Sequence, residues 1–305
     1  MNDNEKGLDR VLPFQIDTLD VRGRHVRLGP VVDTILARHD YPDAVSGLLA
    51  QAILVAVLLG NSVKFDGTFT VQTKSDGAVS MVVADFTTPG AVRGYAQFDR
   101  EALDRLGPDP AFGALVGKGY LAMTLDQGPE TDRYQGIVAL EGEDLAECAE
   151  AYFRDSEQIP TLVRLAARRA WPDGPWLAGG LMVQHLPHGS AGPRADVGGH
   201  LPDPAAEDRW VNARSKAATV TAEELVGPEL RMEEVAWRLY HEDDVRVYST
   251  PVVSVGCRCS RERISQVLAQ FSPEDRADMA VDGKILVTCE FCNAGFAFDP
   301  ETVEA

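Results

Sequence analysis

The sequence predicts an α+β protein in three parts: a mixed helix and strand core in residues 1–186, a linker in residues 187–244 and a small cysteine-rich module in residues 245–305. Three observations carry this prediction. Helical and alternating apolar patterns are interspersed without a regular strand–helix–strand rhythm. A Gly/Pro-rich stretch follows the core. Four of the five cysteines lie within the last fifty residues.

The elements of the core follow from local patterns of apolar residues and turn signals. Apolar residues at helical spacing predict helices at 30–38, 43–59 and 144–154. Alternating apolar and polar residues, or apolar runs bounded by pairs such as Asp-Gly and Pro-Gly, predict strands at 17–28, 68–74, 79–86, 92–98, 119–125, 134–140, 161–170 and 176–184.

The linker is expected to begin with a flexible connection. Of the eighteen residues 187–204, eight are Gly or Pro, and almost none is apolar. Residues 205–241 are then expected to be helical throughout, with a capping box formed by Thr221 and Glu224. The narrow apolar stripe of this segment predicts that it docks on another part of the chain.

The composition excludes several classes of protein. The 305 residues are 45% hydrophobic and 25% charged, which is typical of a globular chain with a substantial core. The formal net charge is −18. Because a chain this acidic repels phosphate backbones, we expect no nucleic-acid partner.

The sequence predicts neither a membrane-spanning segment nor a signal peptide. The longest uninterrupted apolar run, residues 52–59, has eight residues, whereas a membrane span needs about 20. The first ten residues contain acids and no apolar stretch of the kind found in signal peptides. We therefore expect a cytoplasmic protein without a membrane partner, whose cysteines do not form structural disulfides.

The clustered cysteines form two closely spaced pairs, Cys257-Arg-Cys259 and Cys289-Glu-Phe-Cys292, with 29 residues between them. Two such pairs brought together across a loop offer four thiolates to one tetrahedral zinc ion. The sequence therefore predicts one Zn²⁺ per chain, bound by these four cysteines. Basic residues nearby in the sequence could offset the negative charge of the site, namely Arg258, Arg261, Arg263 and Lys284.

Other uses of these cysteines fit the sequence less well. A thioredoxin-like CxxC is followed by a helix, whereas residues 293–296 indicate a turn into another strand. A purely structural zinc knuckle normally has two intervening residues in both pairs, and the first pair here has one. Tightly spaced thiolates also stay open to oxidation when an oxidant removes the metal.

Two candidates for chemistry outside the cluster are expected to be inert. Cys148 lies in the predicted helix 144–154 and is expected to be a buried core residue. His241, in the sequence YHEDDV, does not match the HExxH metal-binding motif and is expected to be a solvated helix end. Because the sequence also contains no phosphate-binding loop and no GxSxG motif, we expect no catalytic site and no enzymatic activity.

Motifs along nearly the whole chain resemble the redox-regulated heat-shock protein 33 family, the 33 kDa chaperonins. These motifs are HDYP at 39–42, LGNSVKFD at 59–66, DRYQG at 132–136, SEQIP at 156–160, AWRLYHE at 236–242 and CRCSRER at 257–263. The Gly/Pro-rich insertion at 187–204 departs from the family pattern, but it touches none of these motifs.

The resemblance implies an ATP-independent chaperone that is inactive while it is reduced and zinc-bound. Oxidants such as hypochlorite are implied to form two disulfides, Cys257 with Cys259 and Cys289 with Cys292, and to release zinc. The module and the linker then unfold and expose a surface that binds unfolding client proteins. The resemblance further implies that the core carries client binding and dimerisation, that the activated form is a homodimer, and that clients pass to ATP-dependent foldases.

Two alternatives from other functional classes remain open. A thiol-disulfide oxidoreductase would turn over its cysteines and would need a thiol that is free of metal. A constitutive zinc-stabilised binding module would act equally well when reduced. An insulin-reduction assay identifies the first alternative, and a comparison of the reduced and oxidised protein identifies the second.

Overall fold

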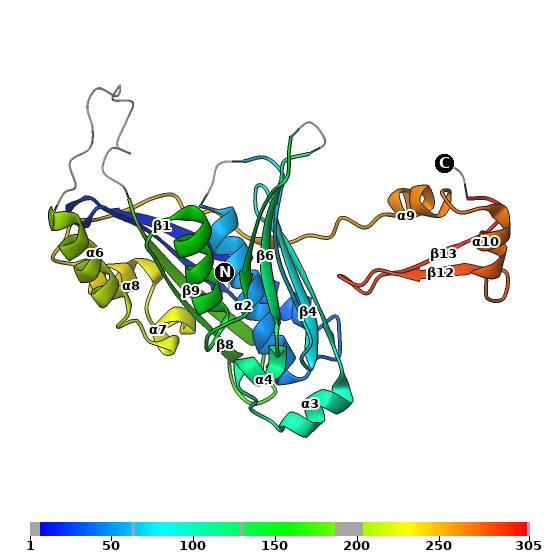
Figure 1. The fold of residues 1–305 in the computed structure, drawn as a ribbon, viewed down its shortest axis with the longest axis horizontal. Helices are drawn as coiled ribbons and strands as arrows, with labels where there is room; N and C mark the ends of the chain where they lie inside the picture. Colours follow the sequence, from blue (N-terminus) through cyan, green and yellow to red (C-terminus); the bar gives the residue numbers. More distant parts are fainter. Residues whose placement is uncertain (1–6, 63–64, 129–130, 187–203, 304–305) are drawn as a thin grey trace, which may run out of the picture. The chain divides into compact units, whose positions relative to one another are not determined.

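The structure is a computed structural model and describes residues 7–62, 65–128, 131–186 and 204–303 (Figure 1). It consists of two compact units, Met1–Val255 and Gly256–Ala305. The α+β class predicted from the sequence is confirmed. The Gly/Pro-rich segment expected at 187–204 lies outside the described residues, apart from Pro204.

Two sheets form the first unit. The first sheet is antiparallel, and its strands in spatial order are β10 (Val245–Val247), β1 (Arg10–Ile16), β2 (Val21–Leu28), β9 (Trp176–His185) and β8 (Thr161–Arg169). The second sheet has the order β11 (Ser254–Val255), β5 (Ala91–Phe98), β4 (Val79–Thr87), β3 (Thr68–Ser75), β6 (Gly119–Asp126) and β7 (Tyr134–Ala139). All of its pairs are antiparallel except β11 with β5.

Helix α2 (Asp43–Gly60) packs against strands of both sheets and forms the centre of the first unit. From Leu48 onward every residue except Gln51 is buried, because a helix between two sheets has no solvated face. Its mean hydropathy of 1.9 and its length would also allow it to cross a membrane, but 78% of it is buried inside the protein. Such burial is typical of a core helix.

Smaller helices complete the core of the first unit. They are α1 (Pro30–Leu36), α3 (Arg100–Leu106), α4 (Phe112–Val116) and α5 (Leu145–Tyr152). Helix α5 begins after Asp144, whose side chain accepts a hydrogen bond from the Glu147 amide. It continues into one π-helical turn at Phe153–Glu157.

The single strand expected at 17–28 is wrong. A 3₁₀ turn at Asp17–Leu19 ends at Asp20 in the left-handed region, with φ 51°, and β2 begins only at Val21. The strand before this turn, β1, is absent from the sequence prediction. The reason is Pro13, which has no amide hydrogen and reads as a signal against a paired strand.

Residues 205–241 are helical in three pieces rather than throughout: α6 (Pro204–Ala217), α7 (Ala222–Val226) and α8 (Met232–Tyr240). Gly227 and Pro228 separate α7 from α8. The predicted capping box of Thr221 and Glu224 is confirmed, since both of its hydrogen bonds are present.

These three helices cover the face of the first sheet that points away from α2. Apolar side chains of the sheet face them, namely Leu12, Phe14, Ile16, Val21, Leu162, Leu181 and Val183. The helices contribute Trp210, Ala213, Val235, Leu239 and Tyr240 to the same core. The expected docking of this segment is therefore observed, and the first compact unit extends through it to residue 255.

The second unit is small. Its elements are α9 (Arg261–Leu268), α10 (Pro273–Asp278), β12 (Ile285–Thr288) and β13 (Gly295–Phe298), and the two strands pair antiparallel. Among its described residues, three apolar side chains form the buried core: Leu268, Ile285 and Phe298. Other large apolar side chains remain exposed, including Val281 at 65% and Leu286 at 68%.

Candidate metal centre

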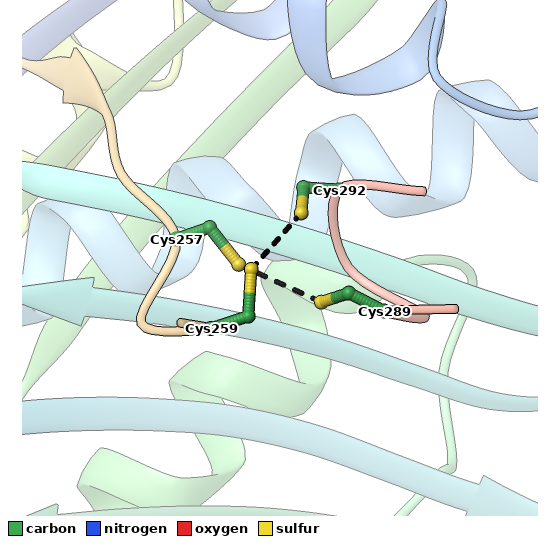
Figure 2. Close-up of side chains that lie close together, drawn as sticks. All are labelled: Cys257, Cys259, Cys289 and Cys292. Carbon is green, nitrogen blue, oxygen red and sulfur yellow. Dashed lines mark hydrogen bonds between the residues drawn. The ribbon is translucent and has the colours of Figure 1, made fainter. Parts of the chain in front are cut away.

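The four clustered cysteines converge in the second unit (Figure 2). Cys257 and Cys259 precede α9, and Cys289 and Cys292 lie in the turn between β12 and β13. Their Sγ atoms all lie within 4.8 Å of one another. The Sγ–Sγ distance is 3.7 Å from Cys257 to Cys289 and 3.3 Å from Cys259 to Cys292.

Local backbone structure positions each pair of sulfurs. Ser260 caps α9 by accepting a hydrogen bond from the Arg263 amide at 3.2 Å, which fixes the chain directly after Cys259. In the second pair, the Asn293 amide donates to the Cys289 carbonyl at 2.8 Å, and the Cys289 amide donates to Ala294 at 3.0 Å. Asn293 has φ 57°, a left-handed conformation that asparagine tolerates. A tight knuckle results.

The sulfur positions fit a tetrahedral metal ion. Four thiolates at about 2.3 Å from a central ion have sulfur–sulfur distances of about 3.8 Å. None of the five cysteines, all in described segments, forms a disulfide in the structure. Four soft sulfur donors suit thiophilic metals and do not suit magnesium or calcium. The four cysteines can therefore hold a metal ion, as the sequence predicts.

The thiols influence one another's ionisation. Burial alone raises the pKa of Cys257, but hydrogen bonds from the Cys259 amide and from the neighbouring thiols outweigh it and bring this pKa to about 7. Burial, together with the other thiols, raises the pKa of Cys259, and burial raises that of Cys292. Ionisation of Cys257 is thus favoured, and ionisation of Cys259 and Cys292 is opposed. A divalent cation removes this opposition, because it stabilises all four thiolates at once.

Basic side chains near the cluster have partners within the second unit. Arg261 donates to the Ala297 carbonyl at 3.0 Å, and its guanidinium lies 4.8 Å from the centre of the Phe298 ring. Lys284 forms an ion pair with Asp299 at 3.2 Å, and Arg263 donates to the Arg258 carbonyl at 2.9 Å. These contacts stabilise the fold around the cysteines, and they place positive charge in the same unit as the four thiols.

The two candidates outside the cluster behave as expected. Cys148 is fully buried in α5, and its Sγ donates to the Glu141 carbonyl at 3.5 Å. Burial raises the pKa of this thiol to about 11, so it is a weak nucleophile at neutral pH. His241 follows the last residue of α8, is exposed, and lies beside Trp237 with 5.2 Å between ring centres.

A second polar feature is missed by sequence reasoning. His25 and Arg27 lie on β2 and are buried against α7 and the turn that follows it. His25 and Arg27 are polar and share one face of the strand, which sequence reasoning treats as its solvated side. Only the docking of the helices that begin at residue 204 shows that this side is covered.

Comparisons with known proteins agree with the resemblance seen in the motifs. The profile of the Hsp33 protein family matches residues 9–299. The 33 kDa chaperonin of Caulobacter vibrioides is 43% identical over 298 residues, which cover 96% of this chain and 95% of the relative. That of Pseudomonas aeruginosa is 38% identical over 300 residues, 97% of this chain and 93% of the relative.

A solved structure shows the same fold. The crystal structure of the 33 kDa chaperonin from Thermotoga maritima matches with a TM-score of 0.79 and 22% identity, over 97% of this chain and 96% of that chain. The family profile and the curated relatives both extend over nearly the full sequence. The chain therefore belongs to the Hsp33 family.

Proposed function

We propose that this protein is a cytoplasmic, ATP-independent chaperone that binds unfolding proteins after its thiols are oxidised. Membership of the Hsp33 family supports a redox-regulated chaperone over a thiol-disulfide oxidoreductase. The observation that carries the regulation is the convergence of four free thiols beside a core of three buried side chains. Neither nucleic acid nor a membrane is a partner in this proposal.

In the reduced state, Cys257, Cys259, Cys289 and Cys292 bind one Zn²⁺ per chain. When bound, the ion links the chain before α9 to the turn between β12 and β13. Structural zinc contributes roughly 10–16 kcal/mol of apparent binding free energy. A unit of about fifty residues with so small a core depends on such a contribution for its fold.

Oxidation by hypochlorous acid removes the metal ligands in two balanced steps. In each step two thiolates lose two electrons and form one disulfide, while one HOCl is reduced to chloride and hydroxide. Two molecules of HOCl per chain therefore convert four thiolates into two disulfides. Because disulfide sulfur carries no negative charge, the oxidised Cys257, Cys259, Cys289 and Cys292 would no longer hold a zinc ion.

The proposed disulfides join neighbours in sequence, Cys257 with Cys259 and Cys289 with Cys292. Such bonds close loops of about three and four residues, for which chain entropy contributes at most about 2 kcal/mol each. They do not connect the two halves of the second unit. The unit therefore unfolds when zinc leaves.

Unfolding is proposed to spread to α6, α7 and α8, which cover the first sheet. Their departure exposes apolar side chains of that sheet, among them Leu12, Phe14, Leu181 and Val183. An exposed apolar face of this kind binds the apolar segments of unfolding proteins. The activated chain forms a homodimer and passes its clients to ATP-dependent foldases.

Light scattering from a thermally unfolding client enzyme tests this proposal. Hypochlorite-treated protein is expected to suppress aggregation, and reduced, zinc-loaded protein is not. A Cys148→Ser variant, treated in the same way, is the control for oxidation of the one cysteine outside the cluster. Equal suppression by the reduced and oxidised protein would indicate the constitutive module, and turnover in insulin reduction would indicate the oxidoreductase.

A further inference from the structure

Arg27 is the bulkiest fully buried side chain among the described residues, with 1% of its surface exposed. It lies on β2, in the middle of the first sheet. Its neighbours Val26 and Leu28 face the core around α2, whereas Arg27 faces α7 and the turn before α8. Burying a guanidinium is costly unless hydrogen bonds replace its water.

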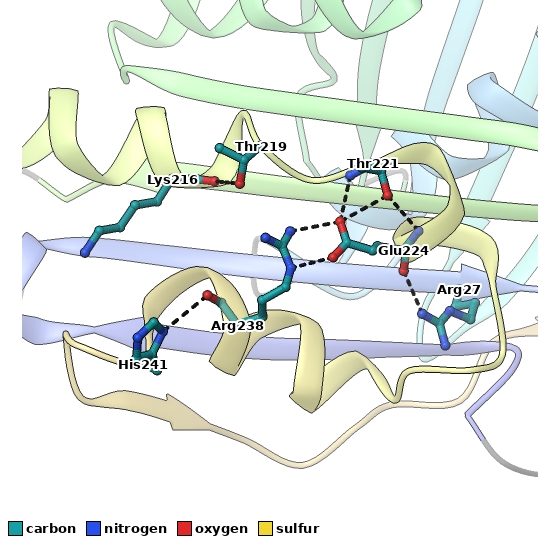
Figure 3. Close-up of polar contacts among 7 residues, drawn as sticks. All are labelled: Arg27, Lys216, Thr219, Thr221, Glu224, Arg238 and His241. Carbon is teal, nitrogen blue, oxygen red and sulfur yellow. Dashed lines mark hydrogen bonds and ion pairs between the residues drawn. The ribbon is translucent and has the colours of Figure 1, made fainter.

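Three backbone carbonyls supply those hydrogen bonds. The Arg27 Nε donates to Leu225 at 3.1 Å, Nη1 donates to Leu230 at 2.8 Å, and Nη2 donates to Glu224 at 2.9 Å. Figure 3 shows the last of these contacts, with the Glu224 side chain turned toward Thr221 and Arg238. Carbonyls at the end of a helix lack partners within the helix and carry its negative dipole, so a cation is favoured there.

The carbonyl of Leu225 is also approached from two other positions of the sheet. His25 Nε2 lies 3.5 Å from it. Gly179, on β9, leaves no room beside it, since a Cβ atom on that residue would lie 2.2 Å from the same oxygen. The backbone of α7 therefore rests directly on the sheet at the place where Arg27 binds it.

We propose that Arg27 is a positioning residue that latches α7 and α8 onto the first sheet and so controls how readily the covered apolar face opens. This inference rests on the proposed function, because it assigns the regulation of client binding. Helix α7 has five residues and is too short to be stable by itself. Its position is therefore set by contacts such as this latch.

The latch also makes the release of α7 and α8 from the sheet all-or-none. In the closed state the guanidinium is satisfied by three carbonyls, and in the open state water satisfies it. A half-open state leaves a buried charge with too few partners, which is the most costly arrangement. Intermediate positions of α7 are thus disfavoured, and release of the helices becomes a switch.

The Arg27→Met variant of the full chain, reduced and zinc-loaded, tests this latch. Amide hydrogen exchange in α7 and α8 is expected to be at least about tenfold faster than in the wild type. The variant is expected to suppress client aggregation without oxidation, while its zinc and free-thiol contents stay unchanged. Arg24→Met is the matched control, because Arg24 lies on the same strand but donates to the Asn61 carbonyl at 3.0 Å.

A second variant introduces a steric clash with the Leu225 carbonyl without removing a charge. Gly179→Ala is expected to push α7 outward and to reproduce both effects. Gly180→Ala is its control, since a Cβ there meets only side-chain atoms of Leu165, Leu58 and Val26, at 3.1–3.3 Å. If Arg27→Met does not fold, Gly179→Ala decides the test.

The latch is rejected if the folded variants keep wild-type exchange in α7 and α8 and still require oxidation for activity. Oxidised wild-type protein is measured alongside. If it fails to suppress aggregation, the proposed function has failed and the latch is judged by exchange alone.

Discussion

Different interactions stabilise the folds of the two units of this chain. In the first unit, α2 is buried at almost every position between two sheets, and a second core lies beneath α6, α7 and α8. In the second unit, four thiols converge beside three buried side chains. Oxidants do not weaken the burial of apolar side chains, whereas they convert metal-binding thiolates into disulfides. The core around α2 is therefore expected to persist under oxidation, whereas the second unit is expected to unfold.

Removal of zinc should produce the largest difference in stability between the two units. A chelator added to the reduced protein removes roughly 10–16 kcal/mol of apparent binding free energy. Exchange in α9, β12 and β13 is expected to rise to the rate of an unfolded chain, while β4 and β5 stay protected. Hydrogen exchange with mass spectrometry measures both regions at once, and a Cys148→Ser variant should bind zinc as the wild type does. Protection of β12 after complete zinc loss would contradict the comparison.

Deleting one core side chain should have different consequences in the two units. Phe298→Ala removes one of three buried side chains at a cost of about 3–5 kcal/mol. Because folding of this unit is coupled to the metal, the loss should appear as zinc affinity weakened by about a hundredfold or more. Competition with a coloured chelator measures it.

The matched deletion in the first unit is Leu54→Ala in α2, which should cost about 2–5 kcal/mol of unfolding free energy. It should lower the midpoint of thermal unfolding of the first unit and leave zinc affinity unchanged. Equal zinc affinity in Phe298→Ala and the wild type would show that the second unit folds without help from its metal.

Thiol reactivity should also differ between Cys148 in the first unit and the four clustered cysteines in the second. The pKa of Cys148 is raised to about 11, so its thiol stays protonated below that pH. Its alkylation by iodoacetamide should be slow at pH 8 and should rise about tenfold per pH unit until pH approaches 11. In zinc-free protein the four clustered cysteines should react much faster at pH 8. Mass spectrometry of timed samples distinguishes the sites, and fast labelling of native Cys148 would overturn this assignment.

The smallest effect is expected for Cys148→Ala. The substitution should cost about 1 kcal/mol of stability and leave oxidation-dependent suppression of aggregation intact. Client light scattering before and after hypochlorite treatment measures how far the suppression of aggregation depends on oxidation. Loss of that dependence in a folded variant would place Cys148 in the regulation.

The parts predicted from the sequence are those with a local signal. The spacing of Cys257, Cys259, Cys289 and Cys292 predicts a shared site, and apolar residues at helical spacing predict the helix at 43–59 that is observed as α2. Strand β1 is missed because Pro13 breaks the local pattern. Arg27 has no local signal at all, since its partners are backbone carbonyls about two hundred residues away, which any sequence offers.

The central claim is that oxidation loosens the chain from α6 to the C-terminus. Disulfide mapping and hydrogen exchange on one hypochlorite-treated sample test it most directly. The sulfur positions alone do not decide the outcome, because Cys257 lies 3.7 Å from Cys289 and Cys259 lies 3.3 Å from Cys292. Such cross-links would close loops about thirty residues long and contribute about 3.7 kcal/mol each by chain entropy.

We expect disulfides between Cys257 and Cys259 and between Cys289 and Cys292, with fast exchange from residue 205 onward and protection retained in β4 and β5. Cross-linked pairs, or protection of α8 and β12 that survives zinc loss, would contradict the account.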